Sequence, residues 1–203
     1  MQRRSLITAL TALATTGLAG CSRTLPAEQA DVAVAERFDG EVDRPQCTVE
    51  SETVEVTVGD ETREYETAAT IPYPDAPSGF RENDVIEWVA AFEEAYLTHR
   101  ILCDRGGSGH ILRIGYTTDR IELLERAGDG WVVFLRYSGG ATAGAGDGGM
   151  WEADVGYSAV AYALDETGAA RVALDEPVNP DSDDIESAVP DPVDEGDLVA
   201  VFE

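Results

Sequence analysis

The sequence contains no lysine, so each of its 14 basic residues is an arginine. Against them stand 40 aspartates and glutamates, which give the 203-residue chain a formal net charge of −26. A chain of this composition has no basic patch to meet phosphate groups, which excludes nucleic acid as a partner. Its carboxylates also repel one another, and molar salt, in which the Debye length is about 3 Å, screens that repulsion.

Several motifs for catalysis or cofactor binding are missing too. There is no Gly-x-Ser-x-Gly elbow, and Ser108 beside His110 lacks triad spacing. Gly144–Gly149 reads G-x-G-x-x-G, but phosphate binding needs a helix after it, whereas a strand-like stretch follows. We expect a hairpin loop over residues 138–149. The acidic run Asp181–Glu186 lacks the glycine and distal glutamate of a calcium loop. We therefore predict no catalytic residue, no metal and no cofactor.

Soft ligands are scarce, because the chain has three cysteines and two histidines. His99, Cys103 and His110 cluster in the sequence, but no methionine lies near them, as a blue-copper site requires. Besides Cys21, the chain keeps Cys47 and Cys103. These two are candidates for a disulfide in an oxidising compartment, and two buried free thiols are the alternative.

The N-terminal stretch combines two basic residues, a short apolar core and small residues before a cysteine, as a secretory signal does. Its apolar part is too short to span about 30 Å of hydrocarbon. Arg3-Arg4 resembles a twin-arginine export signal. Leu18-Ala19-Gly20-Cys21 resembles the lipobox of prokaryotic lipoproteins. That resemblance implies cleavage before Cys21, a lipid on its sulfur and a place on the outer face of the cytoplasmic membrane.

The excess of carboxylates without lysine resembles the proteome of salt-in halophiles. The resemblance implies an acidic, exported protein of a halophilic prokaryote of archaeal type, adapted to molar salt. It also predicts that the fold loses stability when salt is removed.

The chain divides into four parts by composition. We predict a signal peptide over 1–20, a lipid-anchored polar spacer over 21–46, one domain over 47–175 and an acidic, proline-rich tail over 176–203. Within the spacer, the apolar patch Val32–Ala35 has the alternative of docking on the domain. The apolar Leu198–Phe202 predicts a short strand at the end of the tail.

The stretch from Arg81 to Leu102 predicts one long amphipathic helix. One face carries residues at helical spacing: Val85, Trp88, Val89, Phe92, Ala95, Tyr96, His99 and Leu102. Glu87, Glu93 and Glu94 are predicted to lie away from that face.

The other segments alternate between apolar and polar residues, as strands do. Expected strands are Thr48–Val58, Thr62–Thr70, His110–Tyr116 continuing through Arg120–Arg126, Trp131–Tyr137, Trp151–Leu164 and Ala170–Leu174. One helix on a curved antiparallel sheet is an α+β fold. In element order alone it resembles the cystatin-like and NTF2-like folds, which implies nothing about functional residues.

From these observations we expect a non-catalytic binding or structural role at the membrane, with an unidentified protein or small molecule as partner. The first alternative is a small-ligand carrier with a pocket between helix and sheet. Its expected lining is Trp88, Tyr96, His99, Trp131, Tyr137 and Tyr157. The second alternative is a small enzyme in that pocket with His99 as its base. Simple core packing of the aromatic residues stays open.

Overall fold

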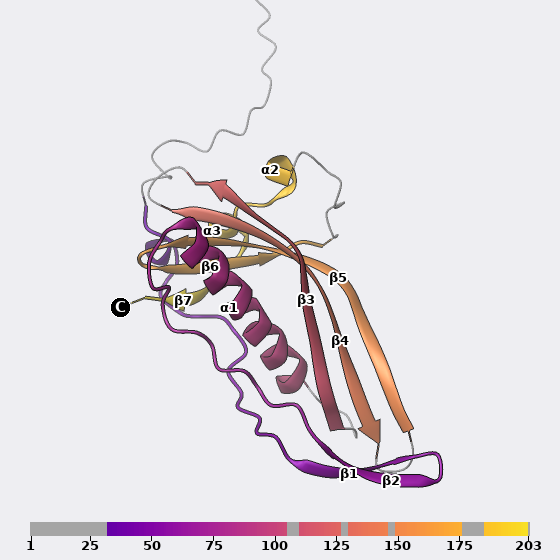
Figure 1. Cartoon of the computed structure of the whole chain (residues 1–203). Coiled ribbons are helices and arrows are strands. Elements are labelled where there is room, and N and C mark those ends of the chain that lie inside the picture. The colour runs from indigo at the N-terminus through magenta and orange to yellow at the C-terminus, as the bar shows by residue number, and fades with distance from the viewer. Residues whose placement is uncertain (1–31, 105–109, 127–129, 146–148, 176–184, 203) are drawn as a thin grey trace, which may run out of the picture.

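The computed structural model of the chain describes residues 32–104, 110–126, 130–145, 149–175 and 185–202. It shows an α+β protein in which one long helix packs against an antiparallel sheet (Figure 1). The expected signal peptide and Cys21 lie outside the described residues, as do residues 181–184 of the acidic run. Among the described residues, no helix is both long and apolar enough to cross a bilayer.

Within the described residues, seven strands and three α-helices follow a short 3-10 helix. In chain order they are η1 Ala35–Arg37, β1 Thr53–Val58, β2 Glu61–Glu66, α1 Glu82–Cys103, β3 His110–Glu125, β4 Trp131–Ala145, β5 Gly149–Asp165, β6 Gly168–Ala173, α2 Ile185–Ala188, α3 Pro192–Glu195 and β7 Asp197–Val201.

Five of the strands form one sheet in the order β3-β4-β5-β6-β7, with every neighbouring pair antiparallel. The single long strand predicted from His110 onward is confirmed as β3. The loop predicted over 138–149 is wrong, because β4 continues to Ala145 and β5 begins at Gly149. The glycines and alanines of this stretch do not show the alternation of apolar and polar side chains that is typical of a strand. The backbone of β4 nevertheless pairs with that of β5 in register.

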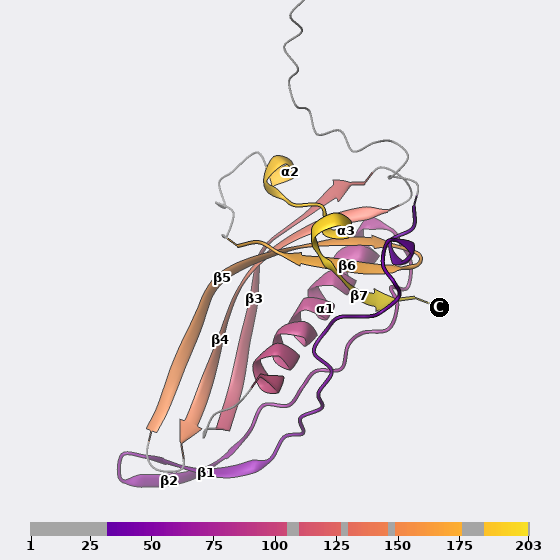
Figure 2. The same cartoon turned by 180° about the vertical axis from the view of Figure 1, so that it is seen from behind.

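β3, β4 and β5 change direction partway along their length (Figures 1 and 2). The pairing of β4 with β5 shifts register between Gly139 and Gly140. Opposite this shift, Gly156 has a φ of 73°, a left-handed conformation that glycine adopts without strain. A bulge of this kind bends its strand and increases the local twist.

The bend divides the sheet into two parts with different coverings. We call residues 110–116, 139–145 and 149–156 the arm, and residues 117–125, 131–138, 157–165, β6 and β7 the body. We call the face of the sheet toward α1 the inner face and the opposite face the outer face.

Helix α1 begins and ends within one residue of its predicted bounds. Its N-cap is Arg81, whose side chain makes no capping hydrogen bond. The predicted apolar face is confirmed: seven of its eight residues are buried, and Tyr96 is half-buried. The prediction that Glu93 faces away is wrong, because Glu93 is fully buried.

The outer face of the body is covered by segments from both ends of the chain (Figure 2). Val34 is fully buried and packs with Ala163, Ala170 and Leu198. The Val34 N–H donates to Asp165 Oδ2 at 2.6 Å. Part of the predicted spacer therefore docks on the sheet, as the alternative for Val32–Ala35 stated.

The end of the chain also joins the fold. β7 pairs with β6, which confirms the predicted terminal strand. α3 begins at Pro192 and is capped by Asp191, whose Oδ1 accepts from the Val193 N–H at 3.0 Å. On the same outer face, Ile185 of α2 packs on Phe134 and Ala159.

β1 and β2 form a separate hairpin that lies at the far end of the arm (Figure 1). Both strands are shorter than predicted, since residues 48–52 and 67–70 are not in strands. Val56 of this hairpin is fully buried. A Cβ added at Gly144 would lie 2.7 Å from Val56 Cγ2, so the glycine makes room for the hairpin.

Candidate functional site

The space between α1 and the sheet, where a ligand pocket was expected, is filled by side chains. Its core consists of Val85, Trp88, Val89, Phe92, Leu97, Val133, Leu135, Tyr137, Val160, Tyr162, Leu164, Ala169, Val199 and Ala200, each at most 7% exposed. Trp88 stacks on Phe92 with ring centroids 4.7 Å apart. These aromatic residues act as core packing.

The indole N–H groups of Trp88 and Trp131 are directed to the protein itself. Trp88 Nε1 donates to the Asp75 carbonyl at 2.7 Å, and Trp131 Nε1 donates to the Phe80 carbonyl at 2.9 Å. A buried indole that already has a backbone partner has no donor left for a ligand.

An ion pair is buried inside this core and joins the helix to the sheet. Arg171 of β6 donates from Nε and Nη2 to the two carboxylate oxygens of Glu93, each at 2.8 Å. The Tyr162 hydroxyl donates to Glu93 Oε2 at 2.5 Å. The Arg171 guanidinium also lies 4.1 Å from the ring centre of Tyr96. Both carboxylate oxygens of Glu93 are thus hydrogen-bonded inside the core.

The electrostatics of this group follow from its burial. Burial raises the pKa of Tyr162 well above its usual value, and the Glu93 carboxylate raises it further. Burial opposes the charge on Arg171, but Glu93, Tyr162 and Tyr96 together raise the arginine pKa above its usual value. Burial also raises the pKa of Tyr137 well above its usual value. These shifts keep the Tyr162 phenol neutral and the Arg171 guanidinium charged, which suits a structural ion pair better than proton transfer.

Tyr157 does not belong with the other expected pocket residues, because it lies on the outer face. Arg136 alternates with the core residues Leu135 and Tyr137, so its side chain points to the outer face. The Arg136 guanidinium lies 4.4 Å from the ring centre of Tyr157, which is 54% exposed.

Tyr157 borders a groove of about 500 Å³ at the bend of the sheet. The groove crosses β3, β4 and β5, and its floor is formed largely by glycine backbone. Its lining residues are Arg113, Gly115, Thr117, Ser138, Gly139, Gly140, Ala141, Thr142, Glu152, Ala153, Asp154, Gly156 and Tyr157. Sequence reasoning missed it, although the glycines of 138–149 were noticed as a loop.

The groove is hollow because its floor lacks side chains and because no described segment covers it. A Cβ added at Gly115 would meet only the Gly140 carbonyl oxygen, at 3.8 Å. Hydroxyl, carboxylate, guanidinium and phenol groups line it together. Such a surface can hydrogen-bond a polar partner, and its carboxylates on β5 favour a cation.

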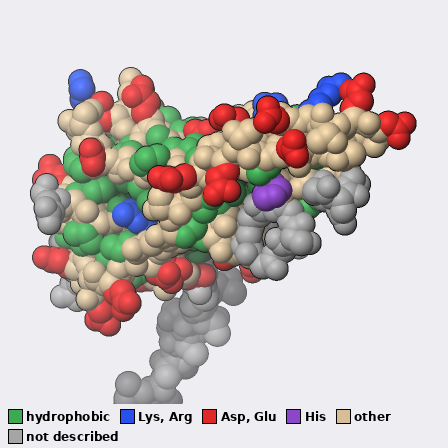
Figure 3. All heavy atoms as spheres, turned by 90° about the horizontal axis from the view of Figure 1, so that it is seen from below, with side chains coloured by type: hydrophobic (Ala, Val, Ile, Leu, Met, Phe, Trp, Pro, Cys, Tyr) green, Lys and Arg blue, Asp and Glu red, His purple; other side chains and the backbone are tan. Residues whose placement is uncertain are grey.

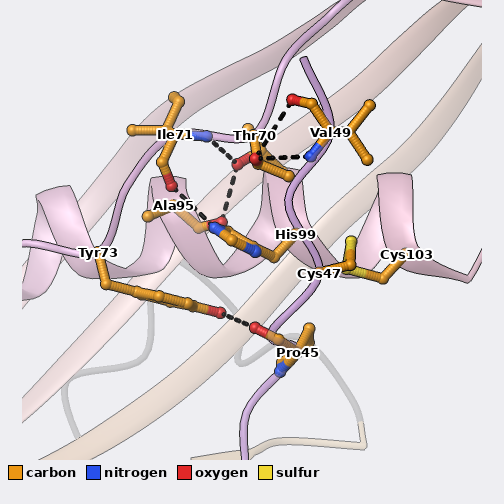
Figure 4. The surroundings of a disulfide bond; sticks show 10 residues. Pro45, Cys47, Val49, Thr70, Ile71, Tyr73, Ala95, His99 and Cys103 are labelled. Atoms are coloured by element: carbon orange, nitrogen blue, oxygen red, sulfur yellow. Dashed lines mark hydrogen bonds between the residues drawn. A yellow bond between two sulfur atoms is a disulfide. The ribbon is translucent and has the colours of Figure 1, made fainter.

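The cysteines and one histidine meet at the end of α1 (Figure 4). Cys47 and Cys103 form a disulfide, with their Cα atoms 5.7 Å apart. His99 lies one helical turn before Cys103 and is 7% exposed. A ring nitrogen of His99 and both sulfurs lie within 4.8 Å of one another.

His110 takes no part in that group. It is exposed and lines a second hollow, of about 460 Å³, together with Thr48, Val49, Glu50, Glu52, Thr67 and Ala68. The soft ligands that the fold brings together are thus Cys47, His99 and Cys103, not His99, Cys103 and His110.

The chain matches no protein-family profile, no curated protein and no solved structure at a significant level.

Proposed function

We propose that this protein is an exported, lipid-anchored binding module of a halophilic prokaryote and that it has no catalytic role. The observation that carries the binding role is the open groove at the bend. The body is covered on both faces, whereas the groove leaves polar groups and glycine backbone accessible. The partner we propose is an extended segment of another exported polypeptide, carrying arginine.

The proposed partner follows from the charges and shape of the groove. Glu152 and Asp154 are both exposed on β5, and Tyr157 beside them offers an aromatic ring to a guanidinium. A narrow groove floored by backbone admits a slender extended chain more readily than a bulky surface. Strand residues 149–154 of β5 pair only with β4 among the described strands, so this edge can receive a further strand.

The groove proposal is tested with an extended peptide of alternating arginine and threonine, titrated in molar KCl and followed by calorimetry. Gly115→Val fills the groove without a backbone clash and should weaken binding at least tenfold. Ala173→Val adds bulk at an exposed strand position outside the groove and should leave binding unchanged. A matched peptide with glutamate for arginine should not bind. Equal affinity in both valine variants would contradict the proposal.

The cellular location of the protein is proposed from its N-terminal residues. Leu18-Ala19-Gly20-Cys21 supports lipidation of Cys21, and Arg3-Arg4 supports twin-arginine export to the outer face of the cytoplasmic membrane. In cells, Cys21→Ser should move the protein from the membrane fraction to the medium. A variant that stays with the membrane would contradict anchoring.

Adaptation to molar salt is proposed from the large negative net charge of the chain. Acidic side chains spread over the face of the molecule shown in Figure 3, with few basic ones among them. We expect the free energy of unfolding to fall sharply between molar and decimolar KCl, because screening of the carboxylates is lost. Equal stability at both salt concentrations would argue against a halophilic origin.

The architecture leads to a further proposal about fold type. One long helix on an antiparallel sheet of bent strands supports the outline of cystatin-like or NTF2-like folds. An experimental structure whose helix crosses the sheet differently would refute that comparison.

A further inference from the structure

The surroundings of the disulfide contain an unusual histidine. His99 Nε2 lies 3.0 Å from the Ile71 carbonyl oxygen (Figure 4). A carbonyl oxygen only accepts hydrogen bonds, so Nε2 carries the ring proton and donates it. His99 Nδ1 is then the bare nitrogen, with its lone pair free to bind.

That lone pair is buried without a partner. Nδ1 has no hydrogen-bond partner among the described residues, and the imidazole is 7% exposed. A buried polar atom left unsatisfied is unfavourable, because it has lost its hydrogen bonds to water without gaining others. The Tyr73 ring stacks on the imidazole with centroids 4.5 Å apart, which fixes the plane of the histidine. The fold therefore holds an acceptor nitrogen in a constant orientation and gives it nothing to accept.

The imidazole lies close to two sulfur atoms. A ring nitrogen of His99 and the sulfurs of Cys47 and Cys103 fall within 4.8 Å of one another. Ligands at about 2.0–2.3 Å from a tetrahedral zinc ion are separated from one another by roughly 3.5–3.8 Å. Moderate side-chain rotation would bring the three atoms to that spacing once the sulfurs part.

The second ring nitrogen has the partner that a metal-binding histidine usually has. In most such sites the nitrogen that does not bind metal donates to a carboxylate or a backbone carbonyl, which fixes the tautomer. The bond from Nε2 to Ile71 provides this arrangement. Cys47 and Cys103 are only partly buried, so the sulfurs are open to a reductant and to a fourth ligand such as water.

We propose that reduction of the disulfide converts Cys47, His99 and Cys103 into a binding site for a thiophilic d10 cation, Zn²⁺ or Cu⁺. An external dithiol supplies the two electrons: the S–S bond breaks, each sulfur gains a proton, and the dithiol becomes a disulfide. The cation then replaces the two thiol protons, which pass to solvent, and takes His99 Nδ1 as its third ligand. The cation substitutes for the covalent link between residue 47 and the end of α1.

The test uses the whole protein, reduced with a dithiol, freed of reductant without oxygen and kept in molar KCl. Co²⁺ is the probe, because tetrahedral thiolate sites give it strong charge-transfer absorption. We expect one equivalent of Co²⁺ to bind the reduced protein, Zn²⁺ to displace it, and the oxidised protein to give no such absorption. Failure of the reduced protein to bind Co²⁺ or Zn²⁺ would overturn the proposal.

Two histidine variants make the test specific. His99→Phe keeps a ring on Tyr73 but removes Nδ1, and we expect it to lower the affinity for Co²⁺ at least about tenfold. His110→Phe removes the other histidine, outside the site, and should bind as the unmodified protein does. Equal loss in both variants, or none in His99→Phe, would show that cysteines alone bind the ion.

If reduction unfolds the chain, circular dichroism decides the outcome. Here we expect Zn²⁺ to restore the helix signal of the reduced protein and not that of reduced His99→Phe. The oxidised His99→Phe variant is compared first, to establish that it folds with the disulfide in place. A helix signal that Zn²⁺ leaves unrestored would also overturn the proposal.

Discussion

The body and the arm of the sheet share strands β3, β4 and β5 but differ in how their faces are covered. In the body, β4 and β5 are buried on both faces, by α1 on the inner face and by the two ends of the chain on the outer face. In the arm, β4 carries small residues in place of large ones, and the outer face holds a groove of about 500 Å³. Burial on two faces yields stability, whereas accessible backbone and polar groups provide a surface for binding.

Residue choice follows this division along a single strand. β4 reads Val133-Phe134-Leu135-Arg136-Tyr137 in the body, where every one of these side chains is buried. It then reads Ser138-Gly139-Gly140-Ala141-Thr142 at the groove. One continuous strand thus carries both a core and a surface, and the bulge at the glycines separates them.

The largest effect should come from breaking the buried ion pair of the body. Glu93→Leu leaves the Arg171 guanidinium buried without its partner, and we expect it to lower the free energy of unfolding by about 3–5 kcal/mol. Denaturant unfolding in molar KCl measures the loss. Glu93→Leu combined with Arg171→Met should recover most of it, because no charge is then buried. A double variant as unstable as the single one would show that the pair itself holds helix and sheet together.

Two glycines of the arm should respond in opposite ways to the same change. Gly144→Ala places a methyl group against Val56 and should cost about 1–3 kcal/mol as overpacking. Gly115→Ala places it in the groove and should be neutral or stabilising, since glycine in a strand costs roughly 0.5–1 kcal/mol against alanine. The two free energies of unfolding are compared under one condition. Equal losses would mean that the groove is packed in solution and the arm resembles the body.

The smallest effect should be a loss of folding stability at alkaline pH, caused by the ionisation of tyrosine on the inner face, which the body and the arm share. Burial raises the pKa of Tyr116 to about 12, whereas a tyrosine in the unfolded chain ionises near pH 10. Between these values the unfolded chain releases a proton that the folded chain keeps. Stability present below about pH 10 should therefore be lost as the pH rises toward about 12.

Tyr116→Phe tests this dependence, because phenylalanine fills the same space and does not ionise. The difference in unfolding free energy between about pH 8 and about pH 11 should be smaller in the variant than in the unmodified protein. Tyr73→Phe should reduce the difference as well, since burial raises the pKa of Tyr73 to about 12. An unchanged difference in both variants would place these rings in contact with solvent.

The elements with strong periodicity were predictable, and those without it were not. α1, β3, β6 and β7 appear close to their predicted places, because apolar residues recur at the spacing of a helix or strand. The arm portion of β4 was mistaken for a loop, since its glycines and alanines give no pattern, whereas β5 was predicted as a strand from Trp151 onward. Glu93 was assigned to the surface because a carboxylate is rarely buried, and nothing local shows that Arg171 will meet it.

The residues of the groove and of the cysteine–histidine group were predictable only where the local sequence pattern indicated them. The glycines of the groove were noticed, but their position in a sheet depends on pairing between strands that are distant in the chain. Cys47 and Cys103 were paired as candidates by elimination, whereas the approach of His99 to both requires the fold. Tyr157 was grouped with the core aromatics because spacing alone does not show on which side of a bulged strand a residue falls.

The sequence by itself determined the helix, most strands, the α+β class and the charge of the surface, because these depend on local periodicity and composition. The tertiary structure decided which polar residues are buried, which face stays open and which three soft ligands meet. Those outcomes depend on contacts between residues far apart in the chain, such as the 56 positions that separate Cys47 from Cys103. Only the register of the sheet and the docking of the helix fix such contacts.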